Sequence, residues 1–224
     1  MTLSMLAADV PHQVISILSE EGINDLRPAQ EKAITAGLLR GKSLLICTPT
    51  ASGKTLIAEL GATKTILSKK GKVIYIVPLV ALATEKAKEF RRRWGAMFRV
   101  ALSVGDFDSA DPRLADYDLI ICTAEKLDSL LRHHAPWLSQ VSLMVVDEIH
   151  LLNDVSRGPT LEILITLLRQ LLPQIQIIGL SATIGNPKEL ADWLDATLVD
   201  DNWRPIPLHK GVYYDGAIEF KDRR

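Results

Sequence analysis

The sequence predicts an α/β domain in which a mostly parallel sheet is covered by helices on both faces. Two observations predict it. Six short apolar segments do not alternate polar with apolar residues, which is typical of strands buried on both faces. The segments between them have helical spacing, and strands that alternate with helices favour right-handed crossovers and a doubly wound sheet. Because no linker, repeat or low-complexity segment divides residues 1–224, we expect one domain.

The expected elements follow one another in a regular order. Strands are expected at 43–47, 73–77, 100–103, 119–122, 143–146 and 175–180. Helices are expected at 30–39, 56–68, 79–94, 125–131, 160–172 and 187–194. Pro28 and Pro187 lie near two helix starts, where a missing N–H costs nothing. We expect residues 1–27 to form an N-terminal helical extension and residues from about 196 to 224 to form the C-terminal edge of the domain.

Composition is that of a soluble globular protein, with 47% hydrophobic and 24% charged residues. The apolar segments are too short for a membrane span, and Pro11 and His12 interrupt the first apolar stretch, which is unlike a signal peptide. We therefore expect a cytoplasmic protein with no membrane partner. Cys47 and Cys122 each end an expected buried strand, so we interpret them as core residues rather than as a disulfide or metal site.

One loop between an expected strand and an expected helix has the composition of a phosphate-binding loop. Its residues are Thr48, Pro49, Thr50, Ala51, Ser52, Gly53, Lys54 and Thr55. In this setting, successive backbone N–H groups and the following helix N-terminus bind phosphate. Lys54 would neutralise the β- and γ-phosphates of ATP, and the Thr55 hydroxyl would ligate Mg²⁺. Thr48 stands where the usual G-x-x-x-x-G-K-[ST] pattern has its first glycine, so other residues must support the site.

Asp147 and Glu148 follow the apolar strand 143–146 and supply that support. Asp147 would hold Mg²⁺ through water, and Glu148 would orient or deprotonate the attacking water. An Asp-Glu pair after a strand is often only a helix cap, but its occurrence with the phosphate loop favours the catalytic interpretation. His150 lies two residues beyond Glu148 and would link this site to another domain or to the next strand.

Two weaker signals lie at other element ends. The Ser181 and Thr183 hydroxyls follow the strand 175–180 and would reach the two acids, although Ser-Ala-Thr alone is typical of a plain turn. Gln30 opens the helix before the phosphate loop, and its planar amide can pair with adenine, although a glutamine there is usually a surface residue.

Charge gives no whole-chain signature of nucleic-acid binding, because the net charge is −1. A local basic patch remains, which is either a phosphate-binding surface or a solvated helix face. Its members are Lys86, Lys88, Arg91, Arg92, Arg93 and Arg99.

Taken together, these motifs resemble a known family. The order of the motifs is that of motifs Q, I, II and III of superfamily 2 helicases, which they resemble: Gln30, the loop 48–55, residues 147–150 and residues 181–183. In that superfamily, Thr or Ala at the start of motif I is ordinary. Residues 78–86, 103–106 and 123–126 resemble motif Ia and the DNA-facing motifs that follow it. Residues 157–162, 181–187 and 203–205 are similar to the Ski-two-like group, and within it to archaeal Hjm-type DNA helicases related to helicase Q.

The resemblance implies a RecA-like P-loop domain and ATP-driven 3′-to-5′ unwinding of branched or stalled DNA forks by a monomeric, nucleoid-associated protein. It implies that Lys54, Asp147 and Glu148 carry hydrolysis, with Thr55 and Asp147 on Mg²⁺. Gln30 would read adenine, while His150, Ser181 and Thr183 would couple hydrolysis to movement. The implied contacts to single-stranded DNA are Leu79, Val80, Lys86, Gly105, Thr123, Lys126 and Arg157.

The family also has a second RecA-like domain with motifs IV to VI, including an arginine that completes the ATP site. We expect this chain to be the N-terminal motor domain facing such a partner, to bind nucleotide weakly and not to unwind DNA by itself. Two alternatives stay open. RNA-directed relatives share the sequence Asp-Glu-Ile-His, and only the 2′-OH discriminates RNA from DNA. The other is a non-catalytic nucleic-acid-binding module, against which the intact Lys54, Asp147 and Glu148 argue.

Overall fold

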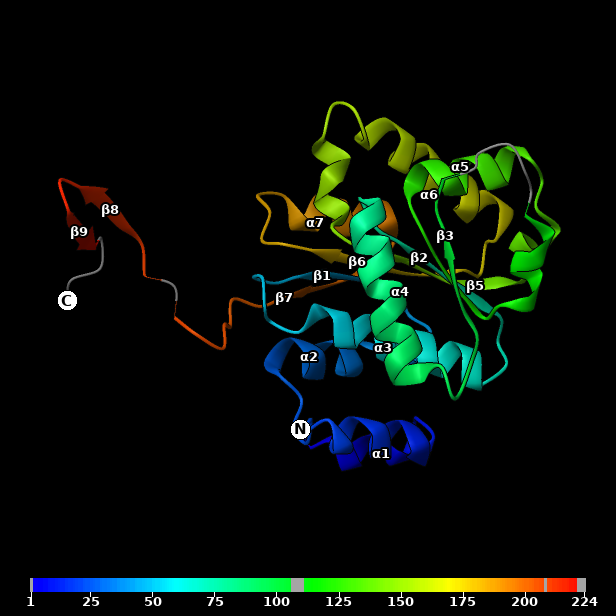
Figure 1. The fold of residues 1–224 in the computed structure, drawn as a ribbon, viewed down its shortest axis with the longest axis horizontal. Coiled ribbons are helices and arrows are strands. Elements are labelled where there is room, and N and C mark those ends of the chain that lie inside the picture. Colours follow the sequence, from blue (N-terminus) through cyan, green and yellow to red (C-terminus); the bar gives the residue numbers. More distant parts are fainter. Residues whose placement is uncertain (1, 106–110, 208, 221–224) are drawn as a thin grey trace.

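A single parallel sheet organises the chain. The computed structural model describes residues 2–105, 111–207 and 209–220. Within these ranges, seven strands pair in parallel in the order β3-β4-β2-β5-β6-β1-β7 (Figure 1). They are β1 Leu44–Cys47, β2 Lys72–Ile76, β3 Val100–Ser103, β4 Leu119–Cys122, β5 Val141–Val146, β6 Gln176–Ser181 and β7 Thr197–Asp200.

Helices cover both faces of the sheet (Figure 1). On one face lie α2 Pro28–Ala36, α3 Lys54–Leu67 and α4 Val80–Trp94, with α1 His12–Glu20 outside them (Figure 1). On the other lie α5 Ala124–Arg132, α6 Gly158–Leu171 and α7 Pro187–Leu194. The described residues also form short 3-10 helices: η1 Leu3–Ala8, η2 Leu38–Arg40, η3 Pro112–Asp116, η4 Pro136–Gln140 and η5 Ile149–Asn153.

The core explains why the strands read as continuous apolar runs. Along β1, Leu44 and Ile46 pack into the cluster under α1–α4, while Leu45 and Cys47 pack into the cluster under α5–α7. Successive side chains of a strand point to opposite faces, so a strand covered on both sides needs apolar residues at every position. All four residues of β1 are buried. The predicted α/β class and two-faced burial are therefore confirmed.

The predicted elements match the observed ones with small differences at their ends. All six expected strands form, and β5 begins two residues earlier than expected, at Val141. The helix expected at 30–39 ends at Ala36, because Gly37 adopts a left-handed conformation with φ of 110° and caps it. A short 3-10 turn, η2, then follows.

Three strands were not expected from the sequence. The edge strand β7 has one buried residue, Val199, so its apolar pattern is too weak to stand out. The hairpin of β8 Gly211–Tyr214 and β9 Ala217–Phe220 is exposed at every position. Its turn is Asp215-Gly216, both with positive φ, and Asp-Gly between two short β-rich runs was a usable hairpin signal.

The N-terminal residues form η1 and α1, and their buried side chains, including Leu6, Val14 and Leu18, join the same cluster as α3 and α4. The division of the chain into an extension, a domain and a C-terminal edge stays a prediction. Across the described residues, no helix combines the length and apolar character that crossing a membrane requires. Because all seven sheet strands are parallel, their carboxyl ends share one edge, where ligands of open α/β sheets bind.

Candidate functional site

The loop after β1 has the conformation of an anion-binding nest. Ala51 and Gly53 have positive φ, of 64° and 91°, and α3 begins directly afterwards at Lys54. The buried hydroxyls of Thr48 and Ser52 lie 2.6 Å apart and close the base of the loop. A Cβ atom at Gly53 would lie 2.5 Å from Gln30 Nε2, so both the backbone angle and the space require glycine here.

Lys54 is held between two strands. Its Nζ donates hydrogen bonds of 3.0 Å to the main-chain oxygens of Thr48 and Ser181. Burial lowers the pKa of the ammonium group, while the charges of Glu148 and Asp147 act in the opposite direction. The ends of β1 and β6 are further joined by a 3.2 Å bond from Thr48 N to the Ser181 oxygen.

Ser181 and Thr183, which are predicted to couple hydrolysis to movement, lie differently from the way the sequence indicated. Ser181 contributes its main-chain oxygen, and no hydrogen bond among the described residues joins its hydroxyl to Asp147 or Glu148. Thr183 is exposed beyond the end of β6. The expected hydroxyl contacts to the acids are therefore absent from this conformation.

Asp147 and Glu148 lie at the end of β5, two strands away from β1. Asp147 Oδ2 accepts a 3.0 Å hydrogen bond from the Tyr75 hydroxyl of β2, and Oδ1 accepts one from Glu148 N. Glu148 has a left-handed backbone with φ of 51°, which is costly for a residue with a side chain. His150 Nδ1 lies 3.3 Å from Glu148 Oε2 without making a hydrogen bond.

Gln30 connects α2 to the phosphate loop. Its side chain is buried; Nε2 donates to Gly53 O at 3.0 Å, and Oε1 accepts from Arg27 N at 2.8 Å. Arg27 donates to Ala51 O at 2.6 Å and lies over the Trp203 ring at 5.7 Å. Nε2 of Gln30 can still donate one further hydrogen bond, and Oε1 can still accept one.

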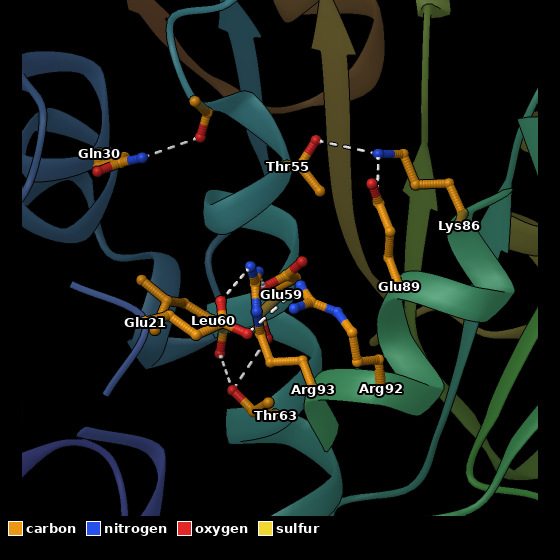
Figure 2. Close-up of polar contacts among 11 residues, drawn as sticks. Glu21, Gln30, Thr55, Glu59, Leu60, Thr63, Lys86, Glu89, Arg92 and Arg93 are labelled. Carbon is orange, nitrogen blue, oxygen red and sulfur yellow. Dashed lines mark hydrogen bonds and ion pairs between the residues drawn. The ribbon is translucent and has the colours of Figure 1, made fainter. Parts of the chain in front are cut away.

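A cavity of about 500 Å³ adjoins the start of α3. It is bounded by the segment between α1 and α2, by Gln30 and Thr55, and by charged residues of α4 that include Lys86 and Arg93. Figure 2 shows these groups converging: Lys86 points toward Thr55, and Arg93 reaches Glu59 one turn further along α3. The cavity borders the phosphate loop at Gly53 and Thr55, and ion pairs of Lys86 and Arg93 line it further along α3 and α4.

The predicted DNA-facing segments follow β2, β3 and β4, on the other half of the same edge. Leu79 and Val80 are 45% and 52% exposed where α4 begins. Gly105 is exposed with φ of 67°, and the next residue of that motif, Asp106, lies outside the described residues. Arg157 is exposed before α6 and borders a small hollow with Pro78 and Ala124.

Several predicted contacts are placed elsewhere. Lys126 is 2% exposed, and Thr123 is buried with its hydroxyl capping α5 through the Lys126 N–H. The Lys86 ammonium lies in the cavity beside Thr55 instead of on the surface with Leu79 and Val80. In this structure, neither lysine side chain is available to a DNA strand at that surface.

The basic residues between Lys86 and Arg99, which were predicted to form one patch, make different contacts in the structure. Arg93 pairs with Glu59 and Glu21, and Arg92 pairs with Glu21 at 3.4 Å. Arg91 donates to Val100 O, and Arg99 donates to Asp116 O. Lys86 and Arg93 are therefore paired inside the domain, whereas Lys88, Arg91, Arg92 and Arg99 stay exposed.

Two residues of the site escaped the sequence analysis. Tyr75 is fully buried, and burial followed by the Asp147 charge raises its pKa well above the usual range. Its signal was a tyrosine in an otherwise aliphatic strand, since a buried hydroxyl needs a partner. Glu59 lies on the apolar-looking helix α3, and its signal was a carboxylate one helical turn after Thr55.

The sequence comparisons agree with this geometry. A model of the family described as DEAD/DEAH box helicase matches residues 27–190, which contain the phosphate loop, both acids and Ser181. The chain belongs to the DEAD/DEAH box helicase family. The RecA-like class predicted from the resemblance is the fold of the solved helicases that match it.

Relatives within this helicase family narrow the resemblance. "ATP-dependent DNA helicase Hel308" of Pyrococcus abyssi is 51% identical over 214 residues, which cover 96% of this chain and 30% of the relative. Its namesake in Methanocaldococcus jannaschii is 54% identical over 217 residues, covering 93% of this chain and 18% of the relative. These matches confirm the resemblance to Ski-two-like DNA helicases. The chain spans about three tenths or less of the length of these curated relatives.

Solved helicase structures share the fold. The DUF1998 helicase MrfA bound to DNA and AMPPNP superposes with a TM-score of 0.76 at 28% identity, over 87% of this chain and 29% of that one. The same helicase bound to DNA alone superposes with a TM-score of 0.75 at 27% identity, over 87% of this chain and 30% of that one.

Proposed function

We propose that this chain is the ATP-binding motor domain of an ATP-dependent DNA helicase that moves 3′ to 5′ and acts on branched or stalled forks. The observation that carries the proposal is the position of Lys54, which bridges the ends of β1 and β6 at the mouth of a phosphate-binding loop. The names of the relatives, ATP-dependent DNA helicases, support the reaction and the substrate class.

Phosphate binding is the task of the loop and of the α3 N-terminus. Main-chain N–H groups and the helix dipole supply partial positive charge there. Lys54 adds a full charge that is already positioned, and ATP phosphates would replace the two carbonyl oxygens as its partners. Gln30, fixed against Gly53, would read adenine with its remaining donor and acceptor.

Thr55 and Asp147 would hold Mg²⁺. A hydroxyl and a carboxylate are the hard oxygen ligands that this ion prefers, and Mg²⁺ typically uses few protein ligands together with water and phosphate oxygens. The ion would neutralise charge on the β- and γ-phosphates. The Tyr75 hydroxyl orients Asp147 through Oδ2, and each carboxylate oxygen keeps a free lone pair for a bound water.

Glu148 would orient the attacking water. His150 Nδ1 lies 3.3 Å from its carboxylate. His150, Ser181 and Thr183 would pass the state of this site to the rest of the motor. Ser181 is suited to that role because its main-chain oxygen already contacts Lys54.

DNA would lie along the ends of β2, β3 and β4. The α4 N-terminus beside Leu79 and Val80, together with exposed Gly105 and Arg157, can approach phosphates without reading sequence. Thr123 and Lys126 would act through the N-terminus of α5.

We further propose a monomeric, cytoplasmic and nucleoid-associated protein in which a second RecA-like domain faces the ATP site. For this reason, this chain alone would bind nucleotide weakly and would not unwind DNA.

Glu148→Gln tests the proposal in the longer protein that carries both RecA-like domains. We expect ATP binding to persist and turnover to fall by at least about a hundredfold, the usual contribution of a general base. Glu20→Gln, the same change at an exposed residue at the end of α1, is the matched control. Normal hydrolysis by Glu148→Gln would refute the catalytic assignment.

Competition between DNA and RNA forks of the same sequence for binding to that longer protein would decide which nucleic acid is the substrate.

A further inference from the structure

Lys86 is the one charged side chain of α4 that reaches the proposed magnesium ligand among the described residues. Its Nζ donates to Thr55 Oγ1 at 3.4 Å and to Glu89 Oε2 at 3.0 Å. The side chain is 17% exposed and lines the cavity at the phosphate loop. Figure 2 shows Lys86 and Glu89 extending from α4 toward the start of α3. The N-terminus of the same helix carries Leu79 and Val80.

A second contact joins the same two helices about two turns further along α4. Arg93 pairs there with Glu59, which follows Thr55 by one turn of α3, and with Glu21 at 2.6 Å. Glu59 is 1% exposed; burial raises its pKa, and the charge of Arg93 opposes that rise. A buried ion pair with a second carboxylate is costly to break, because either charge left alone would be desolvated without compensation. This contact is a fixed anchor between α3 and α4.

The contact at Thr55 differs in being easily broken. A 3.4 Å hydrogen bond is at the long limit for an ammonium and a hydroxyl, and both residues line the cavity. Glu89 is within reach of the same ammonium and would keep it paired after release. A divalent ion on the Thr55 hydroxyl would also repel a positive charge at this distance. Lys86 and a magnesium ion would therefore compete for the Thr55 oxygen.

We propose that Lys86 is a positioning residue that holds α4 against Thr55 in the nucleotide-free state and releases it when magnesium and nucleotide bind. With the Arg93–Glu59 anchor fixed, release lets the other end of α4, with Leu79 and Val80, respond to the nucleotide site. This inference rests on the proposed function, because it requires Thr55 to ligate the metal. It assigns Lys86 to the nucleotide site and not to the DNA strand.

Nucleotide affinity with and without metal is the first test. In this chain, Lys86→Met should bind the Mg²⁺ complex of AMPPNP roughly threefold to tenfold more tightly, because a repelling charge is removed. In EDTA the same variant should bind AMPPNP no more tightly than the parent chain does, since no metal competes there. Lys88→Met, an exposed lysine on the same helix, is the matched control and should match the parent in both conditions.

The second test follows the α4 N-terminus directly. Val80→Cys introduces an exposed thiol for an environment-sensitive fluorophore. The native thiols of Cys47 and Cys122 would not react with the fluorophore reagent, because burial raises the pKa of Cys47 to about 11 and that of Cys122 to about 12. Mg²⁺-AMPPNP should change the signal in the parent and in Lys88→Met. In Lys86→Met, the nucleotide-free signal should already resemble the bound one. Lys86→Arg should restore the parent response.

The outcomes separate this inference from the proposed function. If the parent chain binds no Mg²⁺-AMPPNP, the proposed function and the role of Lys86 are both refuted. If the parent binds it and Lys86→Met shows the same affinities and the same signal change, the role of Lys86 alone is refuted. Lys86→Gln, which keeps a polar side chain without the charge, replaces Lys86→Met if thermal unfolding shows that the methionine variant does not fold.

Discussion

The carboxyl edge of the sheet has two halves that are built differently. At the ends of β1, β5 and β6, two charged groups are held by hydrogen bonds: Lys54 donates to two main-chain oxygens, and Asp147 accepts from the buried Tyr75. At the ends of β2 and β3, Leu79, Val80 and Gly105 are exposed to solvent. The first half is a prearranged set of charges, and the second is an open surface of helix ends and apolar side chains.

This difference follows from what each half is proposed to bind. A triphosphate presents the same charges in the same geometry each time, so fixed partners lower the cost of ordering the site. A nucleic-acid strand that slides past a motor must be held without regard to sequence, which main-chain groups at helix ends allow. Helix α4 belongs to both halves, since Lys86 lies in the first and Val80 in the second.

The largest expected effect comes from removing the central charge of the nucleotide half. Lys54→Ala should lower ATP affinity by more than a hundredfold, because two hydrogen bonds to charged groups contribute about 1.5–3 kcal/mol each. Calorimetric titration with Mg²⁺-ATP would measure this, with Lys70→Ala at an exposed position as control. Affinity for single-stranded DNA should stay at the parent value. Equal ATP binding by the two variants would remove Lys54 from the site.

The next effect concerns the anchor beneath the nucleotide half. Arg93→Ala should lower the free energy of unfolding by about 3–5 kcal/mol, because it leaves Glu59 buried without its partner. Arg92→Ala, whose side chain is 67% exposed, should cost less than about 1 kcal/mol. Urea unfolding followed by circular dichroism would compare the two neighbours. Similar losses would show that burial does not distinguish them.

The smallest effect probes the open half. Val80→Asp places a negative charge at the first residue of α4, which favours the helix but repels phosphate. We expect roughly tenfold weaker binding of single-stranded DNA, an effect that salt should reduce. Fluorescence anisotropy would measure it, and ATP affinity should not change. Val80→Asn is the uncharged control. If Val80→Asp binds DNA as Val80→Asn does, DNA does not pass this helix end.

The sequence by itself determined the local features of this protein. The unbroken apolar runs predicted six of the seven sheet strands, because burial on both faces leaves a mark at every residue. Motif spacing also predicted that Lys54, Thr55, Asp147 and Glu148 share one edge, because parallel strands end together. Short, weakly buried β7 was missed, since one buried side chain is too little pattern to detect.

Only the tertiary structure decided which groups meet. The fold places β6 beside β1, and there the Ser181 main-chain oxygen accepts a hydrogen bond from Lys54. It also turns α4 so that Lys86 reaches Thr55 and Arg93 reaches Glu59, which divides a run of basic residues that reads as one patch. Such contacts join residues about thirty to more than a hundred positions apart, and no local pattern in the chain encodes the partner of a long, flexible side chain.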